Sequence, residues 1–133
     1  MRYLLDTNVC IYIARKQPAS VLRRFERLRP GDVGISVVTW LELTYGAWKS
    51  TQREANLARL ERFRQLVPVL PMDLTTAEHY GRIRATLERE GKPIGAYDLQ
   101  IAAHAMSLGL TLVTNNVREI SRIPSLRMEN WVD

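Results

Sequence analysis

The stretch that decides the fold is YLLDTN at residues 3–8, followed by the apolar run VCIYI at residues 9–13. Short apolar stretches on either side of an acid, Asp6, are typical of a buried strand that gives way to a helix. This order puts Asp6 at the carboxyl end of a strand. Because ligands bind at that edge in open α/β sheets, the first residues of the chain indicate where a functional site would lie.

The overall composition predicts an ordinary globular protein. Hydrophobic residues make up 46% of the 133 residues and charged residues 25%, and no apolar run reaches the roughly 20 residues that a membrane span needs. The single cysteine, Cys10, cannot form an internal disulfide and the N-terminus does not resemble a signal peptide, so we expect a cytoplasmic protein with no membrane partner. The net charge of +5 favours nucleic acid as a partner over a merely soluble basic surface.

Strand and helix signals alternate along the chain, with no repeat and no linker, and predict a single domain over residues 1–133. The expected strands lie at residues 2–5, 33–35, 67–70, 110–113 and 126–128. The expected helices lie at residues 7–14, 18–29, 37–48, 51–66 and 96–108, with one more that begins at the capping box TTAE (75–78) and ends at Gly91. Strands separated by helices predict a mostly parallel sheet of four to five strands covered on both faces, an α/β three-layer sandwich.

Two of these helices are expected to turn one apolar face inward. In the helix at 37–48 the expected inward residues are Val37, Val38, Leu41, Tyr45 and Trp48. In the helix at 51–66 and just after it they are Leu57, Leu60, Phe63 and Val67. Pro68 indicates that the third strand lies near a sheet edge or at a strand start.

Three acids stand out from their apolar surroundings. Asp6 ends the first strand. Glu42 lies four residues after Val38 and three before Tyr45, so it borders an apolar stripe and is expected to be half-buried. Asp98 lies in the first turn of an otherwise apolar helix, where the helix dipole favours its ionised form.

Carboxylates that meet at one sheet edge require a counter-charge, since otherwise one of them would protonate. Three of them predict a hard divalent cation, Mg²⁺ with Mn²⁺ as the alternative, because both ions take oxygen ligands. A metal-bound water could attack a phosphodiester while the metal neutralises charge on the phosphoryl oxygens. Together with the basic net charge, this pattern favours a nuclease in which arginines hold the nucleic acid and the acids cut it.

Each acid also has a purely structural explanation. Asp6 could cap the helix that follows it, Asp98 could be an ordinary first-turn acid, and Glu42 could pair with one of many arginines. The prediction of a metal site therefore depends on whether the three acids meet in space.

Several sequence blocks resemble those of the PIN-domain nucleases. Residues 1–8 resemble the family's opening, a hydrophobic strand that ends in D-T-N or D-T-S. SVVTWLELTYG (36–46) is similar to its second block, S-x-x-T-x-x-E-L-x-Y-G, and GAYDLQIAAHA (95–105) to its third, D-x-x-I-A-A-H-A. LVTNNVREI (112–120) and LRMENW (126–131) resemble the closing blocks. The blocks span the chain in the family's order, and the subgroup that they resemble is the VapC toxins of bacterial type II toxin–antitoxin pairs.

This resemblance implies a PIN-like fold and a Mg²⁺-dependent endoribonuclease whose substrate is structured RNA, with transfer RNA suggested by the subgroup. It assigns the three family acids to Asp6, Glu42 and Asp98 as catalytic and metal-binding residues. It also implies a VapB-type antitoxin and a homodimer, with a heterotetramer or larger assembly formed with the antitoxin. The residues that we expect to line an antitoxin groove are Cys10, Ile11, Tyr12 and Phe25.

The chain departs from the family pattern after the last core strand, where many members have a fourth acid. Here that position is Asn115 or Asn116, which carry no charge, and Glu119, one helical turn on, is the candidate catalytic substitute. Thr7 and Asn8 follow the family pattern, and the resemblance implies that they orient Asp6 or a water.

Three other functions can be weighed against the nuclease. A non-catalytic RNA-binding domain with structural acids would bind RNA regardless of Mg²⁺. A phosphatase of the haloacid-dehalogenase type also begins at an Asp that ends the first strand, but it needs a second Asp two residues on, where this chain has Asn8. A receiver domain would need a lysine near the end of its last strand, and none is present there.

Overall fold

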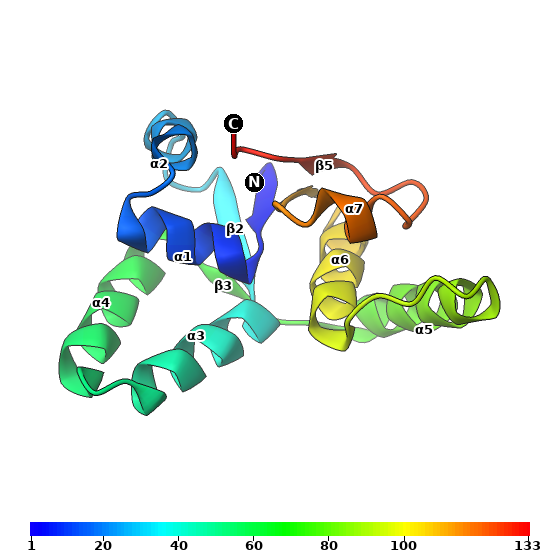
Figure 1. Ribbon diagram of the computed structural model, residues 1–133, viewed down its shortest axis with the longest axis horizontal. Coiled ribbons are helices and arrows are strands. Elements are labelled where there is room, and N and C mark those ends of the chain that lie inside the picture. The colour runs from blue at the N-terminus through cyan, green and yellow to red at the C-terminus, as the bar shows by residue number, and fades with distance from the viewer.

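The computed structural model describes residues 1–133 and has a five-stranded parallel sheet at its centre (Figure 1). The strands are β1 (Tyr3–Leu5), β2 (Val33–Ser36), β3 (Val69–Leu70), β4 (Thr111–Val113) and β5 (Met128–Glu129). Their order in the sheet is β3-β2-β1-β4-β5, with every neighbouring pair parallel. The predicted α/β class is therefore confirmed, and the strand that ends at Asp6 is the central one.

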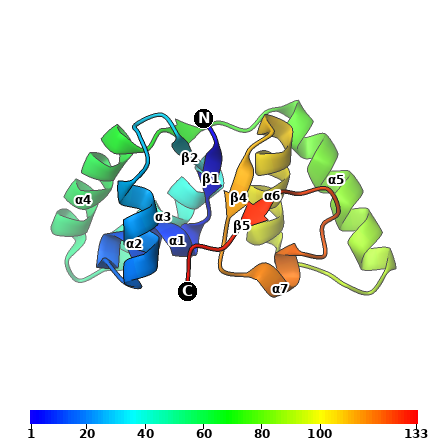
Figure 2. The same cartoon turned by 90° about the horizontal axis from the view of Figure 1, so that it is seen from above.

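Seven helices surround this sheet. They are α1 (Thr7–Arg15), α2 (Ala19–Glu26), α3 (Val37–Lys49), α4 (Arg53–Leu66), α5 (Leu74–Arg89), α6 (Ala96–Leu108) and the short α7 (Val117–Ile120), which the sequence patterns did not predict. Figure 2 shows α1, α2 and α4 on one side of the sheet and α5, α6 and α7 on the other. None of the helices combines the length and the apolar composition that crossing a bilayer requires.

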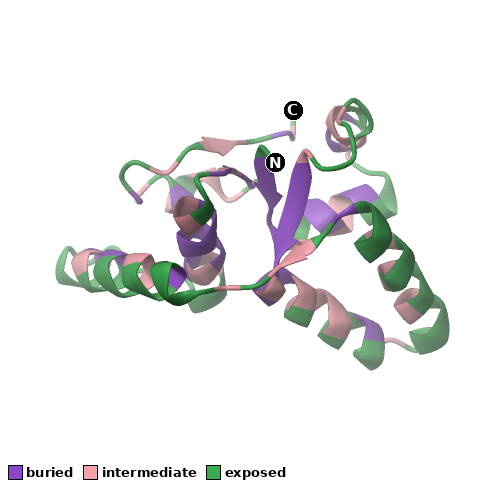
Figure 3. Cartoon of the chain, turned by 180° about the vertical axis from the view of Figure 1, so that it is seen from behind, coloured by how far each residue is buried: buried purple, intermediate pink, exposed green.

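The alternation of side chains along the strands divides the interior into two cores. Leu4 and Leu112 contribute to the core under α5 and α6. Tyr3, Leu5 and Val113 contribute to the core under α1 and α2, on the opposite face. Figure 3 shows the central strands buried, whereas α4 and α5 are exposed over much of their length. The sheet is thus covered on both faces, as the strand–helix alternation predicted.

The third strand is shorter than expected, at Val69–Leu70, and it lies at the sheet edge as Pro68 indicated. The start of α5 also differs from the prediction. The cap is Asp73, whose carboxylate accepts hydrogen bonds from the backbone N–H of Thr75 and Thr76 at 3.0 and 3.2 Å. The capping box at 75–78 was therefore the wrong boundary, because an acidic cap two residues earlier also gains from the helix dipole.

The predicted inward stripe of α3 is wrong for its three outer members. Leu41, Tyr45 and Trp48 are 63%, 66% and 55% exposed. The buried residues of α3 are Val38, Thr39 and Ala47. The reason is visible in Figure 1, where α3 leaves the sheet after its first turns and runs beside α4.

The expected inward residues of α4 are only partly buried. The helix has no fully buried residue, and Phe63 packs against the margin of the core under α1 and α2. Val67, just past its end, is completely buried. Because α4 packs mainly on α3 and does not cover the sheet, its apolar spacing overstated its burial.

Candidate active site

The three middle strands end level with one another at the carboxyl edge of the sheet. The register pairs Leu5 of β1 with Ile35 of β2 and with Val113 of β4. The next residue, Asp6, donates its backbone N–H to the Val113 carbonyl oxygen at 3.0 Å. The first residues of α1 and α3 and the loop after β4 therefore start from the same edge.

Asp6 is the most buried acid of this edge, with 7% of its surface exposed. Its side chain caps α1, since Oδ1 accepts the Val9 backbone N–H at 2.9 Å. The pKa of Asp6 is raised from 3.8 to about 6, mainly because the carboxyl is buried; hydrogen bonds with Thr114 and Val9 lower it, and the charges of Asp98 and Glu42 add to the rise. Asp6 is therefore both the helix cap and a carboxylate that lies within reach of two other acids.

Glu42 is held by a residue from the start of α1. The Thr7 hydroxyl donates to Glu42 Oε1 at 2.6 Å, and the same hydroxyl oxygen lies 3.2 Å from Thr39 Oγ1. Thr39 is fully buried, one turn before Glu42 on α3. We expected Thr7 to orient Asp6 or a water, but its hydroxyl orients Glu42 instead.

Asp98 and Glu119 share a neutral partner, Asn116. The Asn116 side-chain amide donates to Asp98 Oδ2 and to Glu119 Oε2, both at 3.2 Å. Burial raises the pKa of Asp98; the Asn116 hydrogen bond lowers it and the charge of Glu119 raises it again. Asn116, one of the two asparagines that the resemblance offers for the family's fourth acidic position, thus lies between Asp98 and Glu119.

No basic side chain neutralises these acids. The four ion pairs of the protein are Arg23–Asp133, Arg24–Glu129, Arg64–Glu61 and Arg84–Glu88. The acids at the edge are hydrogen-bonded only to neutral groups. The carboxylates do not lie close enough together to bind one ion, because no group of three or more His, Cys, Asp or Glu side chains has the geometry of a metal site. The charge and the oxygen donors fit a divalent cation, whereas the convergence on one ion stays a prediction.

Other expected residues lie around this edge in different roles. Asn8 is exposed, and Asn115 donates its amide to the Tyr12 hydroxyl at 3.4 Å. Cys10 is 2% exposed and belongs to the core, so it cannot line a groove. The site residues that sequence reasoning missed are Thr39 and Thr114. Thr39 is the threonine of the S-x-x-T block and Thr114 directly follows the fourth strand, but neither was given a role.

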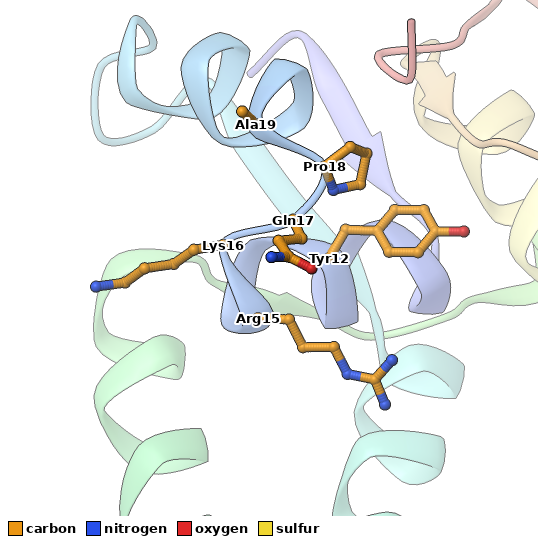
Figure 4. Close-up of a pocket in the computed structure, with 6 residues that line it drawn as sticks. All are labelled: Tyr12, Arg15, Lys16, Gln17, Pro18 and Ala19. Carbon is orange, nitrogen blue, oxygen red and sulfur yellow. The ribbon is translucent and has the colours of Figure 1, made fainter.

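A hollow of about 700 Å³ opens at the end of α1. One of its lining residues is Tyr12, whose hydroxyl accepts the Asn115 amide hydrogen bond at the sheet edge. Figure 4 shows its lining residues, which are Tyr12, Arg15, Lys16, Gln17, Pro18 and Ala19. Arg15 and Lys16 point in different directions from the end of the helix. Neither cation has an acidic partner, so a positively charged surface begins about one helix length from Asp6.

Comparison with known proteins gives the same assignment along the whole chain. The PIN domain profile matches residues 3–126. The chain is 49% identical over 131 residues to the tRNA(fMet)-specific endonuclease VapC of Shigella flexneri, covering 98% of both chains. It is 45% identical over 132 residues to Ribonuclease VapC2 of Haemophilus influenzae, covering 99% of both.

Solved structures agree with this similarity. A chain of the DNA-bound VapBC structure from Salmonella typhimurium superimposes with a TM-score of 0.92 at 46% identity, with 99% of each chain covered. A chain of VapBC-1 from nontypeable Haemophilus influenzae gives a TM-score of 0.91 at 37% identity, with full coverage of both. The chain therefore belongs to the PIN-domain family and, within it, to the VapC ribonucleases.

Proposed function

We propose that this protein is a Mg²⁺-dependent endoribonuclease toxin of a type II toxin–antitoxin pair, and that its substrate is transfer RNA. The observation that carries the proposal is the set of acids at the sheet edge, which no Lys or Arg neutralises in an otherwise basic protein. The VapC relatives support the RNA substrate, and the names of those from Shigella flexneri and Salmonella typhimurium specify tRNA(fMet).

Asp6, Glu42 and Asp98 are the residues that would hold the cation, with Glu119 as a fourth carboxylate. Their donors are all carboxylate oxygens, which suit Mg²⁺ and Mn²⁺ better than softer metals. When bound, the ion supplies an activated water and neutralises charge on the phosphoryl group. The pKa values of Asp6 and Asp98 are raised, and a bound cation would lower them again by stabilising the ionised carboxylates.

The neutral partners orient the carboxylates without cancelling their charge. Thr7 fixes Glu42 through its hydroxyl, and Asn116 fixes Asp98 and Glu119 through its amide. A lysine or arginine at either position would compete with a cation for the same oxygens. These hydrogen bonds therefore prepare the acids for a metal and reduce the reorganisation that binding requires.

The RNA backbone would cross the basic hollow at the end of α1. Arg15 and Lys16 line this hollow, and α1 is nine residues long, which at about 1.5 Å per residue puts its end ~13 Å from Asp6. Unpaired cations at that distance would contact phosphates a short way along the strand from the cleaved bond. The hollow thus extends the acidic site with the electrostatic contacts that RNA affinity requires.

Control by an antitoxin follows from the same assignment. An active ribonuclease requires an inhibitor in its own cell, and the similar chains from Salmonella typhimurium and Haemophilus influenzae come from VapBC structures. We propose a VapB-type antitoxin as partner and a homodimer as the toxin's own assembly, joined with the antitoxin in a heterotetramer or larger complex. Size-exclusion chromatography with light scattering, on the toxin alone and with its antitoxin, measures both assemblies.

The test of the activity is cleavage of purified transfer RNA by the metal-free protein, with Mg²⁺, Mn²⁺ or EDTA added. We expect discrete cleavage with either metal, none in EDTA, and none for Asp6→Asn. The matched control is Glu61→Gln, which removes an exposed acid on α4 far from the sheet edge and should cleave at the wild-type rate. RNA binding that is indifferent to metal and without cleavage would identify a non-catalytic RNA-binding domain instead.

A further inference from the structure

His104 is a completely buried polar residue for which neither fold nor function has yet given a reason. It lies on α6, six residues after Asp98, with 0% of its surface exposed. Its Nδ1 lies 2.8 Å from Ser36 Oγ and its Nε2 lies 3.1 Å from the Pro71 carbonyl oxygen. Both ring nitrogens are therefore used, and each one reaches a different element.

The partners assign the tautomer of the ring. A carbonyl oxygen can only accept, so Nε2 carries the proton and Nδ1 is the acceptor of the neutral imidazole. The Ser36 hydroxyl must then donate to Nδ1, while its oxygen accepts the Val38 backbone N–H at 3.1 Å. Burial lowers the pKa of His104, which agrees with a neutral ring.

Ser36 is the N-cap of α3. Its hydroxyl has one proton, and the hydrogen bond to His104 fixes the direction in which that proton points. The lone pairs of the oxygen are thereby aimed at the first turn of α3, the helix that carries Glu42. No other side-chain hydrogen bond joins α6 to the start of α3, so His104 is the single polar link between the helices of Asp98 and Glu42.

We infer that His104 is a positioning residue: through the Ser36 cap it sets the first turn of α3, and so the place of Glu42 relative to Asp98. This inference rests on the proposed ribonuclease function. His104 touches neither acid and would not contact RNA. Its effect should therefore appear in the rate of cleavage and leave RNA affinity unchanged.

The same helix offers a matched control. Ser107 Oγ lies 2.9 Å from Thr76 Oγ1 and joins α6 to α5. This hydrogen bond also starts from α6 and also ends on a buried hydroxyl, but it leads to a helix that carries none of the acids at the edge. Ser107→Ala removes this bond together with the one that Ser107 Oγ donates to the His104 backbone carbonyl oxygen at 2.8 Å, and it leaves the His104 side-chain link to α3 intact.

The experiment compares single-turnover cleavage of transfer RNA at saturating protein, far below the melting temperature of every variant. Because small displacements of reacting groups cost about 10- to 100-fold in rate, we expect His104→Leu and Ser36→Ala to slow cleavage by at least ~10-fold. His104→Asn keeps an acceptor near the Nδ1 position and should recover most of the rate. Ser107→Ala should lower the melting temperature but keep the wild-type rate, and RNA affinity in EDTA should be unchanged throughout.

The double variant Ser36→Ala, His104→Leu separates a shared pathway from two independent defects. Non-additive effects, with the double variant no slower than the slower single one, would support the inference, because the two residues act through one bond. If His104→Leu and Ser36→Ala cleave at the same rate as Ser107→Ala, after correction for the folded fraction, the inference is overturned. If His104→Leu fails to fold, Ser36→Ala and His104→Asn still decide the question. If the wild-type protein cleaves no RNA with any metal, the proposed function fails first and this inference with it.

Discussion

Replacing Asp6 with asparagine should stabilise the metal-free protein while removing its activity. Asp6 is 7% exposed, and its pKa is raised to about 6, first by burial and then by the charges of Asp98 and Glu42. Asparagine is as good a helix cap as aspartate, so its Oδ1 can still accept the Val9 N–H. The substitution therefore removes a costly charge and keeps the hydrogen bond.

The size of the effect follows from the pKa. At about 1.4 kcal/mol for each pH unit between folded and unfolded values, the rise from 3.8 to about 6 costs the folded state about 3 kcal/mol at neutral pH. A raised carboxyl pKa contributes stability that is fully present below pH 3.8 and is lost as the pH rises through about 6. The variant's advantage should thus be absent near pH 3.8, grow between pH 4 and 6, and reach about 1–3 kcal/mol above pH 7.

Urea unfolding in EDTA, repeated at steps from pH 4 to pH 8, measures this difference. Added Mg²⁺ should then reverse the order, because ligand binding stabilises only the protein that binds it. Glu61→Gln serves as the control, since it removes an exposed charge whose one ion pair, with Arg64, lies at the surface and contributes little to stability. An Asp6→Asn protein that is less stable than wild type at pH 7.5, or a difference that does not change with pH, would refute the reasoning.

Three further predictions follow from the contacts at the edge. Asn116→Asp should destabilise the metal-free protein by about 1–2 kcal/mol, because it adds a carboxylate beside Asp98, and should tighten Mn²⁺ binding about tenfold or more by calorimetry. Thr7→Val should slow cleavage about tenfold by freeing Glu42 from a charge-assisted hydrogen bond, with RNA affinity unchanged; a wild-type rate would contradict the role of this hydroxyl. RNA binding in EDTA should weaken steeply with salt, and Arg15→Ala should reduce the slope of log K against log salt by about 0.7; an unchanged slope would move the RNA path elsewhere.

The sequence was sufficient for the sheet and for the edge at which Asp6 lies. An apolar stretch that stops at Asp6 and is followed by a helix signal indicates a strand end, and the helix signals between the strands favour parallel pairing. The apolar periodicity wrongly predicted that Leu41, Tyr45 and Trp48 are buried. An apolar stripe shows that one face of a helix is apolar, but it does not show which element covers that face. The start of α5 was wrongly predicted because two capping signals, Asp73 and Thr75, lie two residues apart, and the acidic residue is the one that caps the helix.

The partners of the acids could not be predicted, because they come from distant parts of the chain. Thr7 reaches Glu42 across 35 residues and Asn116 reaches Asp98 across 18. Neither hydroxyl nor amide shows a pattern in sequence that would identify its acceptor. Only the fold brings these residues to one edge, and the resemblance to PIN domains pointed to the positions without giving their contacts.

The neutrality of these partners connects the fold to the proposed chemistry. The protein has nineteen basic side chains, yet none of them forms an ion pair with the four acids at this edge, Asp6, Glu42, Asp98 and Glu119. Instead the acids receive hydrogen bonds from a threonine, an asparagine and one backbone N–H, that of Val9, which orient a carboxylate but leave its charge. Uncompensated charge destabilises the folded state, as the raised pKa values of Asp6 and Asp98 indicate. Such a cost is expected at a functional site, where a cation supplied from outside the chain would remove it.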